Sequence, residues 1–275
     1  MKKLMVALMI AMSVFVFVSC SKQSPLETDD SGDGVLYQRP EFVDDRPEEV
    51  KAKFTLSDSE PVELDATASK GAKYALVIGI SNYAGTVNDL NYCDDDAADW
   101  AAFLQSKGYS VTKITDLSAT KSAIESAMNT LASRSVAGNE VFFVYSGHGY
   151  NGNMISTDMY YLSYSWMAGK FSKATCMKMG FTFDACNIGA FKTALGKAKG
   201  RVVAVASGTK NYSYDGDSTM KNGVFTYYQM DGWDRYGYFE ADNQYACDMM
   251  VKWGKAHGVR CTPSFSDSYS DYLIP

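Results

Sequence analysis

The sequence predicts an α/β domain whose mainly parallel sheet carries helices on both faces. Apolar runs such as 74–80 and 201–206 show no polar alternation, which is typical of strands buried on both faces. Helical segments separate these runs, and strand alternating with helix at this rhythm is typical of a parallel sheet. The chain has 275 residues, of which 46% are hydrophobic, so it is large enough for a sizeable core. We see no internal repeat and no second domain.

The predicted domain covers residues 71–275. Strands are expected where β-branched and aromatic residues gather, at 74–80, 109–114, 141–145, 180–183 and 201–206. Helices are expected at 94–107, 119–133, 190–199, 223–230 and 243–256. In the first of these helices Trp100 and Leu104 have core spacing, and Gly108 is its stop signal.

Residues 1–19 have the pattern of a signal peptide and are not expected to belong to the fold. Lys2 and Lys3 precede an apolar run, 4–18, that is short for a membrane span. The run leads into Phe17-Val18-Ser19-Cys20, which resembles a bacterial lipobox. We therefore expect an exported protein, lipid-anchored to a bacterial membrane through Cys20, which would be the outer membrane or cell surface if the cell is Gram-negative. A plain secretory signal cleaved nearby is the alternative.

Residues 20–70 are polar and acidic, and they include four prolines. This composition favours a flexible tether. The later part, 35–64, contains scattered apolar residues, so a packed N-terminal strand or a pro-segment stays open as well. The whole chain has a formal net charge of −6 and no basic patch, which argues against nucleic acid as a partner.

An odd number of cysteines follows the predicted signal segment. Outside the cytoplasm disulfides are possible. Besides Cys20 the chain has five cysteines: Cys93, Cys176, Cys186, Cys247 and Cys261. At least one of these is left unpaired within a monomer, and a free thiol in an oxidising compartment calls for a reason. Nucleophilic catalysis is one such reason.

Two short motifs each follow a predicted strand directly. Ser-Gly-His-Gly at 146–149 follows the strand at 141–145, and Asp-Ala-Cys-Asn at 184–187 follows the strand at 180–183. Active sites of open α/β sheets lie at the carboxyl ends of the strands. The 38 residues between His148 and Cys186 are enough for a crossover that makes the two strands parallel neighbours. A histidine and a cysteine presented together are a base and a nucleophile.

The other candidates for these two roles have simpler explanations. His257 follows a predicted helix and precedes Gly258, so it is expected to cap that helix, where its partial positive charge suits the helix dipole. Cys247 lies inside a predicted helix and is assigned to the core. Cys186 taken alone is consistent with a buried core thiol. Its place after Asp184, beside a strand that ends in histidine, favours the catalytic interpretation.

The residues around this pair suggest a mechanism. His148 would stabilise the Cys186 thiolate or take its proton during attack on a carbonyl. The amides of Gly149 and Cys186 are candidate donors to the tetrahedral oxyanion. Asp184, two residues before the nucleophile, would bind a cationic substrate side chain. Neither histidine has a second ligand at metal spacing, so we expect no catalytic metal and no required cofactor.

The order of these motifs along the chain resembles that of a known family. The segments 75–83, 90–97, 146–149 and 184–186 occur in the order found in metacaspases and related caspase-like peptidases, and 206–208 with 222–226 are similar to that family's small-subunit region. The resemblance covers about 73–270. It implies the caspase–haemoglobinase fold, a three-layer sandwich, with a Cys-His dyad.

The resemblance also implies preference for Arg or Lys before the cleaved bond, because metacaspases use acidic residues in that pocket. Asp184 and Asp96 match those acids by position. Asp96 has an equally good structural explanation, because it helps to open a helix, where an acid is stabilising. Calcium activates some metacaspases, and the sequence leaves calcium dependence open.

The sequence departs from the family pattern in two places. Ile188 stands where the family often has serine, and the segment 154–179 is short with a weak helix; these departures concern the pocket wall and any activation loop. Basic residues lie in that segment at Lys170, Lys173 and Lys178. Family members often cut themselves after basic residues, so activation by self-cleavage there or near Lys70 is a hypothesis.

The leading interpretation is a cysteine endopeptidase that cleaves peptide bonds after Arg or Lys through a thioester. Its expected partners are a peptide or protein substrate with a basic residue before the cleaved bond, and a membrane through Cys20. One alternative is a catalytically silent caspase-like module that binds partners at the surface. Another is a peptide ligase with the same dyad, because hydrolysis and aminolysis pass through one thioester.

Overall fold

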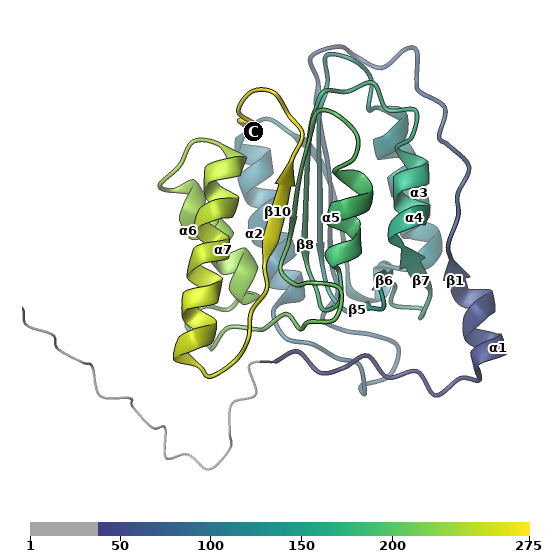
Figure 1. Cartoon of the computed structure of the whole chain (residues 1–275). Coiled ribbons are helices and arrows are strands. Elements are labelled where there is room, and N and C mark those ends of the chain that lie inside the picture. Colours follow the sequence, from purple (N-terminus) through teal and green to yellow (C-terminus); the bar gives the residue numbers. More distant parts are fainter. Residues whose placement is uncertain (1–37) are drawn as a thin grey trace, which may run out of the picture. The chain divides into compact units, whose positions relative to one another are not determined.

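The computed structural model describes residues 38–275, in which one six-stranded sheet forms the centre (Figure 1). Its strand order is β10-β9-β8-β4-β2-β3. Five strands are mutually parallel, and the edge strand β10 pairs antiparallel with β9. The strands are β2 (Lys73–Gly79), β3 (Ser110–Thr115), β4 (Glu140–Ser146), β8 (Lys178–Asp184), β9 (Arg201–Val205) and β10 (Ser264–Asp267).

Helices cover both faces of this sheet. Figure 1 shows α2 (Cys93–Ser106), α6 (Val224–Trp233) and α7 (Phe239–Ala256) on one face, and α3 (Lys121–Ser133), α4 (Tyr164–Lys170) and α5 (Gly189–Leu195) on the other. Alternate side chains of β2 join the two layers of core, since Leu76 and Ile78 pack on the α3 side while Ala75 and Val77 pack on the α2 side. This is the predicted three-layer α/β sandwich.

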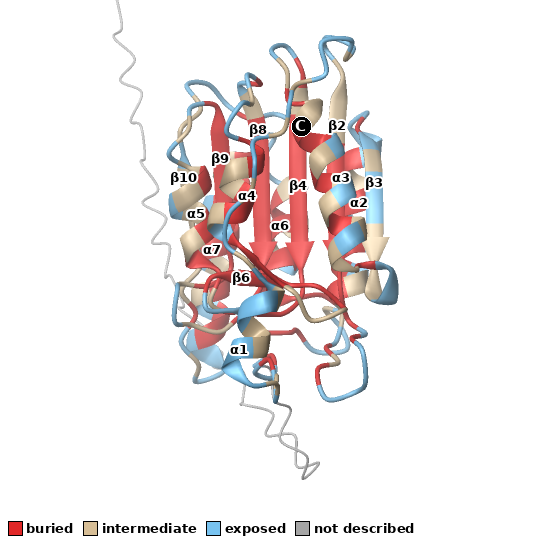
Figure 2. Cartoon of the chain, turned by 90° about the vertical axis from the view of Figure 1, so that its right-hand side faces the viewer, coloured by how far each residue is buried: buried red, intermediate tan, exposed pale blue. Residues whose placement is uncertain are grey.

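Burial follows the position of each strand in the sheet. Figure 2 shows the central strands buried along their length, whereas the edge strand β3 is largely exposed. The apolar runs of the sequence are therefore the strands that neighbours cover on both faces.

Residues 38–70 pack against the domain and are not a free tether. They contain α1 (Glu48–Lys51), the short 3₁₀ helix η1 (Ala52–Phe54) and β1 (Thr55–Leu56). Phe42 is buried in the core, and Phe54 and Leu56 pack against it. The predicted boundary at residue 71 thus lies just before β2, the first strand of the main sheet along the chain, and is not the start of the packed chain. Burial of these scattered apolar residues holds the segment in place.

A second, smaller sheet lies beside the carboxyl ends of the main strands. Its order is β1-β7-β6-β5, with β5 (Gly149–Tyr150), β6 (Asn153–Ile155) and β7 (Tyr161–Ser163). Its hairpin begins directly after His148, so it fixes the chain on that side of the site. The segment 154–179, in which the sequence indicates a weak helix, contains part of this sheet and α4.

The ten elements expected from the sequence are all present, with ends shifted by a few residues. The small sheet, β10, α1 and the 3₁₀ helices η1 and η2 (Asp116–Ser118) were not predicted, because elements of two to four residues carry too little pattern. His257 is the C-cap of α7, as predicted, and its Nδ1 lies 2.8 Å from the Trp253 carbonyl oxygen. No helix among residues 38–275 is long and apolar enough to cross a membrane. The predicted signal segment and Cys20 lie outside the described residues.

Candidate active site

The two chemical motifs meet at the carboxyl ends of adjacent strands. β4 and β8 are parallel neighbours, and Ser146 is opposite Asp184 in their register. His148 and Cys186 each follow two residues later, on loops that leave the same edge of the sheet. Both side chains are buried, with exposed fractions of 2% and 6%. The predicted proximity of the two strands is therefore observed.

A backbone carbonyl orients the His148 ring. Nε2 of His148 lies 2.9 Å from the carbonyl oxygen of Asn88. A carbonyl only accepts, so Nε2 carries the proton and Nδ1 is left as the basic nitrogen. Tyr83 lies against the ring at 4.9 Å between centroids, and its hydroxyl accepts a hydrogen bond from the His148 amide at 2.8 Å. Burial lowers the pKa of His148 to about 4, so the imidazole is neutral at physiological pH.

The Cys186 thiol is similarly enclosed. The Ser213 amide donates to Sγ of Cys186 at 3.2 Å. Burial raises the pKa of Cys186 to about 11, so the thiol is protonated near neutral pH. Each of the two groups is thus held in its uncharged form.

Gly149 brings the backbone of the histidine loop against Cys186. A Cβ atom built at Gly149 would lie 1.9 Å from the carbonyl oxygen of Cys186, so only glycine fits. The Ile155 amide donates to the His148 carbonyl, which makes the next pair, Gly149 and Met154, a non-hydrogen-bonded one. The Gly149 amide accordingly points away from β6. This direction is compatible with the predicted oxyanion role.

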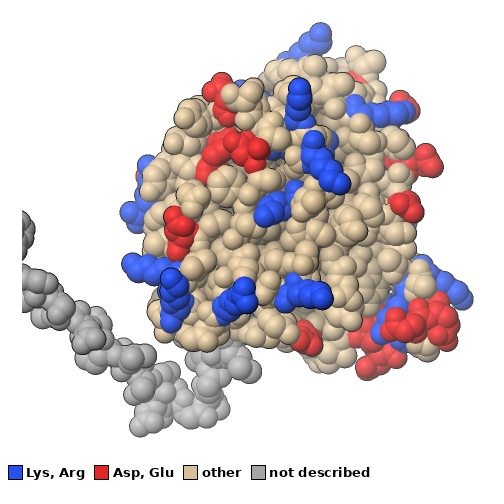
Figure 3. Space-filling view, viewed as in Figure 1, with Lys and Arg blue, Asp and Glu red and all other residues tan. Residues whose placement is uncertain are grey.

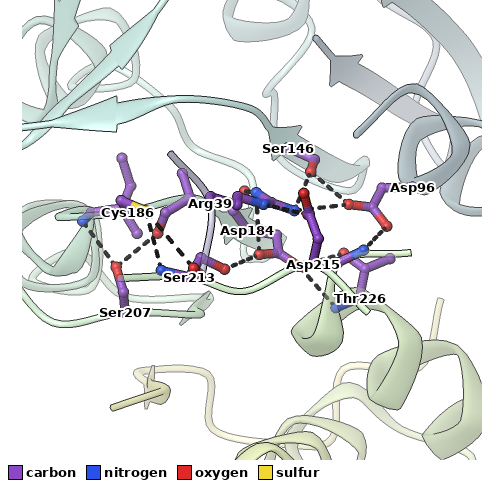
Figure 4. Close-up of polar contacts among 12 residues, drawn as sticks. Arg39, Asp96, Ser146, Asp184, Cys186, Ser207, Ser213, Asp215 and Thr226 are labelled. Atoms are coloured by element: carbon purple, nitrogen blue, oxygen red, sulfur yellow. Dashed lines mark hydrogen bonds and ion pairs between the residues drawn. The ribbon is translucent and has the colours of Figure 1, made fainter. Parts of the chain in front are cut away.

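Beside Cys186 lies a pocket built from three buried carboxylates (Figure 4). Asp184 ends β8, Asp96 lies in the first turn of α2, and Asp215 follows Ser213 on the loop after β9. Their exposed fractions are 2%, 0% and 5%. Three acids so close together would repel one another without a cation between them.

The cation in this pocket is Arg39, which is 1% exposed. Its Nε donates to Asp215 at 2.7 Å, and its Nη1 donates to the Asp184 carbonyl oxygen and lies 3.4 Å from the Asp184 carboxylate. Its Nη2 lies 3.4 Å from Asp96 and 3.3 Å from the Ser146 hydroxyl. Every nitrogen of the guanidinium therefore has an oxygen partner, an arrangement suited to its planar fork.

Further hydrogen bonds fix the carboxylates. Asp184 accepts from the Ser213 hydroxyl at 2.5 Å and from the Thr226 amide at 3.0 Å. Asp96 accepts from the Ser146 hydroxyl at 2.6 Å and from the Gly223 amide at 2.9 Å. Burial, followed by the charge of Asp184, raises the pKa of Asp96 well above its ordinary value. Asp96 thus faces the pocket as well as opening α2.

All the residues that the sequence singled out at this site lie together, but three important ones were missed. Arg39 and Asp215 complete the acid pocket, and Asn88 orients His148. Arg39 is one of several basic residues in an acidic segment, and nothing local links it to residues more than fifty positions away. Asp215 and Asn88 lie in loops, where contacts depend on the tertiary fold.

The two departures from the family pattern, at Ile188 and in the segment 154–179, leave the dyad and the acid pocket in place. Ile188 is fully buried in the core and does not line the cavity at Cys186. Of the suggested self-cleavage positions, Lys170 is buried and paired with Glu125 at 3.1 Å, and Lys178 begins β8. Lys70 and Lys173 are exposed in turns.

The described cysteines are all reduced. Cys93, Cys176, Cys186, Cys247 and Cys261 are free and buried. Among residues 38–275 no group of three or more His, Cys, Asp or Glu side chains is placed to hold a metal ion. Cys186 is the one described cysteine whose loop lies against the histidine loop through Gly149.

Comparison with known proteins agrees with this fold. A family model described as the caspase domain matches residues 72–245, which is more than half of the chain. The chain therefore belongs to the caspase-domain family and has the fold of a caspase-like cysteine peptidase. No curated protein matches the sequence closely.

One similar solved structure is protein GSU0716 from Geobacter sulfurreducens. The TM-score is 0.52 at 18% sequence identity, and the match covers 70% of this chain and 92% of that one. At this identity the likeness supports the fold alone.

Proposed function

We propose that the protein is a metacaspase-like endopeptidase that cleaves peptide bonds after arginine, and less well after lysine. The observation that supports the substrate preference is the buried pocket of Asp96, Asp184 and Asp215 beside Cys186, which holds a guanidinium group. Three buried acids favour a cationic side chain. Because each of the three guanidinium nitrogens has its own partner, the pocket favours arginine over lysine, which has a single ammonium nitrogen.

The proposed reaction uses His148 and Cys186 as a dyad. Nδ1 of His148 takes the thiol proton as Sγ attacks the carbonyl carbon of the arginine residue. The developing oxyanion is stabilised by the Gly149 and Cys186 amides. His148 then protonates the leaving amine, and a thioester remains on Cys186. Water attacks this thioester in the second half of the reaction, releases the acid and regenerates the thiol.

The proposal also covers the class of substrate, from the surface charges, and the location of the protein, from its N-terminus. On the face shown in Figure 3, Lys and Arg side chains are spread out among Asp and Glu, with no continuous basic track. This supports a peptide rather than a nucleic acid as substrate. Cys20 would attach the exported enzyme to a bacterial membrane by its lipid, with no required cofactor.

The test uses a chain that lacks only residues 1–20, which are the predicted signal peptide and Cys20, as wild type and as Cys186→Ala. Both are assayed on peptides with Arg, Lys, Asp or Asn before a fluorogenic leaving group, with and without calcium. Cleavage after Arg that the variant loses is the expected result. Cleavage only after Asp or Asn would overturn the role given to the acid pocket. An added amine nucleophile would reveal a ligase by its amide product.

A further inference from the structure

The cation in the acid pocket belongs to the chain's own N-terminal segment. Arg39 lies 145 positions before Asp184 in the sequence. Its amide donates to the Ser213 carbonyl oxygen at 3.3 Å, and Gln38 pairs with Tyr214 in an antiparallel bridge. The segment thus lies as a short extended strand along the loop whose Ser213 amide contacts Sγ of Cys186. The main chain of Arg39 is therefore held at the nucleophile.

The residues after Arg39 continue across the other half of the site. Phe42 packs against the His148 ring, with 5.4 Å between centroids. Asn88 binds both main-chain groups of Val43 through its side-chain amide, at 2.8 and 2.9 Å, while its carbonyl oxygen orients His148. Glu41 accepts a hydrogen bond from the Tyr212 hydroxyl. The segment therefore passes from Cys186 to His148, and its antiparallel bridge at Gln38 is the kind of pairing by which a peptide adds to a strand edge.

Little space is left for a second peptide. The cavity beside Cys186 has a volume of about 80 Å³. Pockets that take a drug-sized ligand have roughly 300–1,000 Å³. Glu41 and Phe42 form part of the cavity wall, so the segment itself sets this limit. A substrate can reach Cys186 only when residues 38–43 move away.

We propose that residues 38–43 are a built-in pseudosubstrate, with Arg39 in the arginine pocket, that keeps the site closed until the segment is displaced. This rests on the proposed function in taking the pocket as the one for the residue before the cleaved bond. In this arrangement the bond aligned with Cys186 is Arg39–Pro40.

Pro40 explains why the segment in the site is not cleaved. Its nitrogen carries a ring carbon in place of a hydrogen, and the ring fixes the backbone angle. Cleavage would require His148 to protonate this nitrogen as it leaves. The ring carbon occupies part of the path along which the His148 ring would approach the nitrogen. The segment therefore binds as a substrate does but is not turned over. The neutral thiol and imidazole described above suit such a closed, latent site.

The test compares Arg39→Ala with a matched control, Arg46→Ala, in the chain without residues 1–20. Arg46 lies on the same segment but pairs with Asp44 and touches no residue of the dyad or acid pocket. Two readouts are measured: cleavage of an arginine peptide, and alkylation of Cys186 by iodoacetamide, followed by peptide mass spectrometry. Because exposure restores thiolate character, Arg39→Ala is expected to raise both rates by about tenfold or more, with Arg46→Ala unchanged.

The two readouts separate this proposal from the proposed function. Faster alkylation of Arg39→Ala without any peptide cleavage would show that the segment covers Cys186, but it would overturn the peptidase and with it the pseudosubstrate role. A wild-type chain that already cleaves as fast as Arg39→Ala, with equal alkylation, would keep the peptidase and overturn the pseudosubstrate. Equal, slow alkylation of wild type and a folded Arg39→Ala would likewise overturn it.

Removal of Arg39 leaves buried acids uncompensated, so a second experiment does not depend on that variant. Pro40→Ala keeps Arg39 in its pocket and restores a hydrogen on the nitrogen that leaves. We expect this chain to cut itself after Arg39, giving a new N-terminus at residue 40, and Pro40→Ala/Cys186→Ala to stay intact. If Pro40→Ala also stays intact while arginine peptides are cleaved by the same sample, Arg39 is not aligned as a substrate and the proposal is wrong.

Discussion

Nε of Arg39 lies 2.7 Å from Oδ1 of Asp215, and both side chains are buried beside Cys186. Asp215 was not among the acids that the family resemblance implied, yet it makes the shortest ion pair in the pocket. It binds Nε of Arg39, and lysine has a carbon, Cε, at that position in its side chain. Asp215 is thus placed to distinguish arginine from lysine.

The first prediction concerns this selectivity. Asp215→Asn keeps the size of the side chain and removes its charge. In the Arg39→Ala chain we expect kcat/KM for an arginine peptide to fall by about 10- to 100-fold, since a hydrogen bond to a charged group is worth about 1.5–3 kcal/mol. The lysine peptide should lose less. Asp217→Asn, in an exposed turn two residues further on, is the control. An equal loss for both peptides would contradict this role of Asp215.

The second prediction concerns the floor of the pocket. A Cβ atom at Gly223 would lie 2.4 Å from Nη2 of Arg39 and 2.4 Å from the Asp184 carboxylate. Gly223→Ala should therefore exclude the Arg39 side chain from the pocket. It should also lower the free energy of unfolding by about 1–3 kcal/mol through overpacking. Thermal unfolding and arginine-peptide cleavage measure the two effects. Gly237→Ala, where an added Cβ meets nothing within 4 Å, should change neither.

The third prediction concerns the oxyanion donors. Gly149→Ala would press a methyl group against the Cys186 carbonyl oxygen and displace the Gly149 amide. Because loss of one oxyanion donor costs about 10²- to 10³-fold in rate, peptide cleavage should fall by that factor in the Arg39→Ala background. Alkylation of Cys186 needs no oxyanion and should change far less. A parallel loss of both rates would point to a damaged thiol site and not to a missing donor.

The fourth prediction concerns pH. Burial raises the pKa of Cys186 to about 11, and only the thiolate reacts with iodoacetamide. Since the charged form becomes more populated as pH rises, the alkylation rate of the wild-type chain should climb up to about pH 11 without an earlier plateau. Arg39→Ala removes a cation that lowers the pKa of Cys186, but it also exposes the thiol, and burial is the larger cause of the raised pKa, so the plateau should come at lower pH. Cys176 and Cys261 also have pKa values raised to about 11 by burial, so the modified peptide must be identified. A wild-type plateau below pH 9 would contradict the closed site.

The sheet and the helices that cover it could be predicted from the sequence, because long segments carry a clear period. The pattern at 141–145 and 180–183 placed His148 and Cys186 at the ends of neighbouring strands, and β4 and β8 are adjacent in the structure. The small sheet could not be predicted in the same way. Its strands are two or three residues long and are stabilised by tertiary contacts.

The acid pocket was only partly predictable. Asp184 follows from its place two residues before Cys186, on the same side of a strand. Asp96 had a competing explanation as a helix-opening acid, and it serves both purposes, since it lies in the first turn of α2 and faces Arg39. Arg39 could not be found from the sequence, because its partners come from four other segments and its neighbours read as a tether.

The most direct test of the central claim is covalent labelling with a peptide probe that carries arginine next to a thiol-reactive ketone. The Arg39→Ala chain is treated with this probe and with the matching aspartate probe, and the labelled residue is located by mass spectrometry. We predict one arginine label, on Cys186, none in Arg39→Ala/Cys186→Ala, and none from the aspartate probe. Equal labelling by the aspartate probe, or an arginine label on any other cysteine, would contradict the claim.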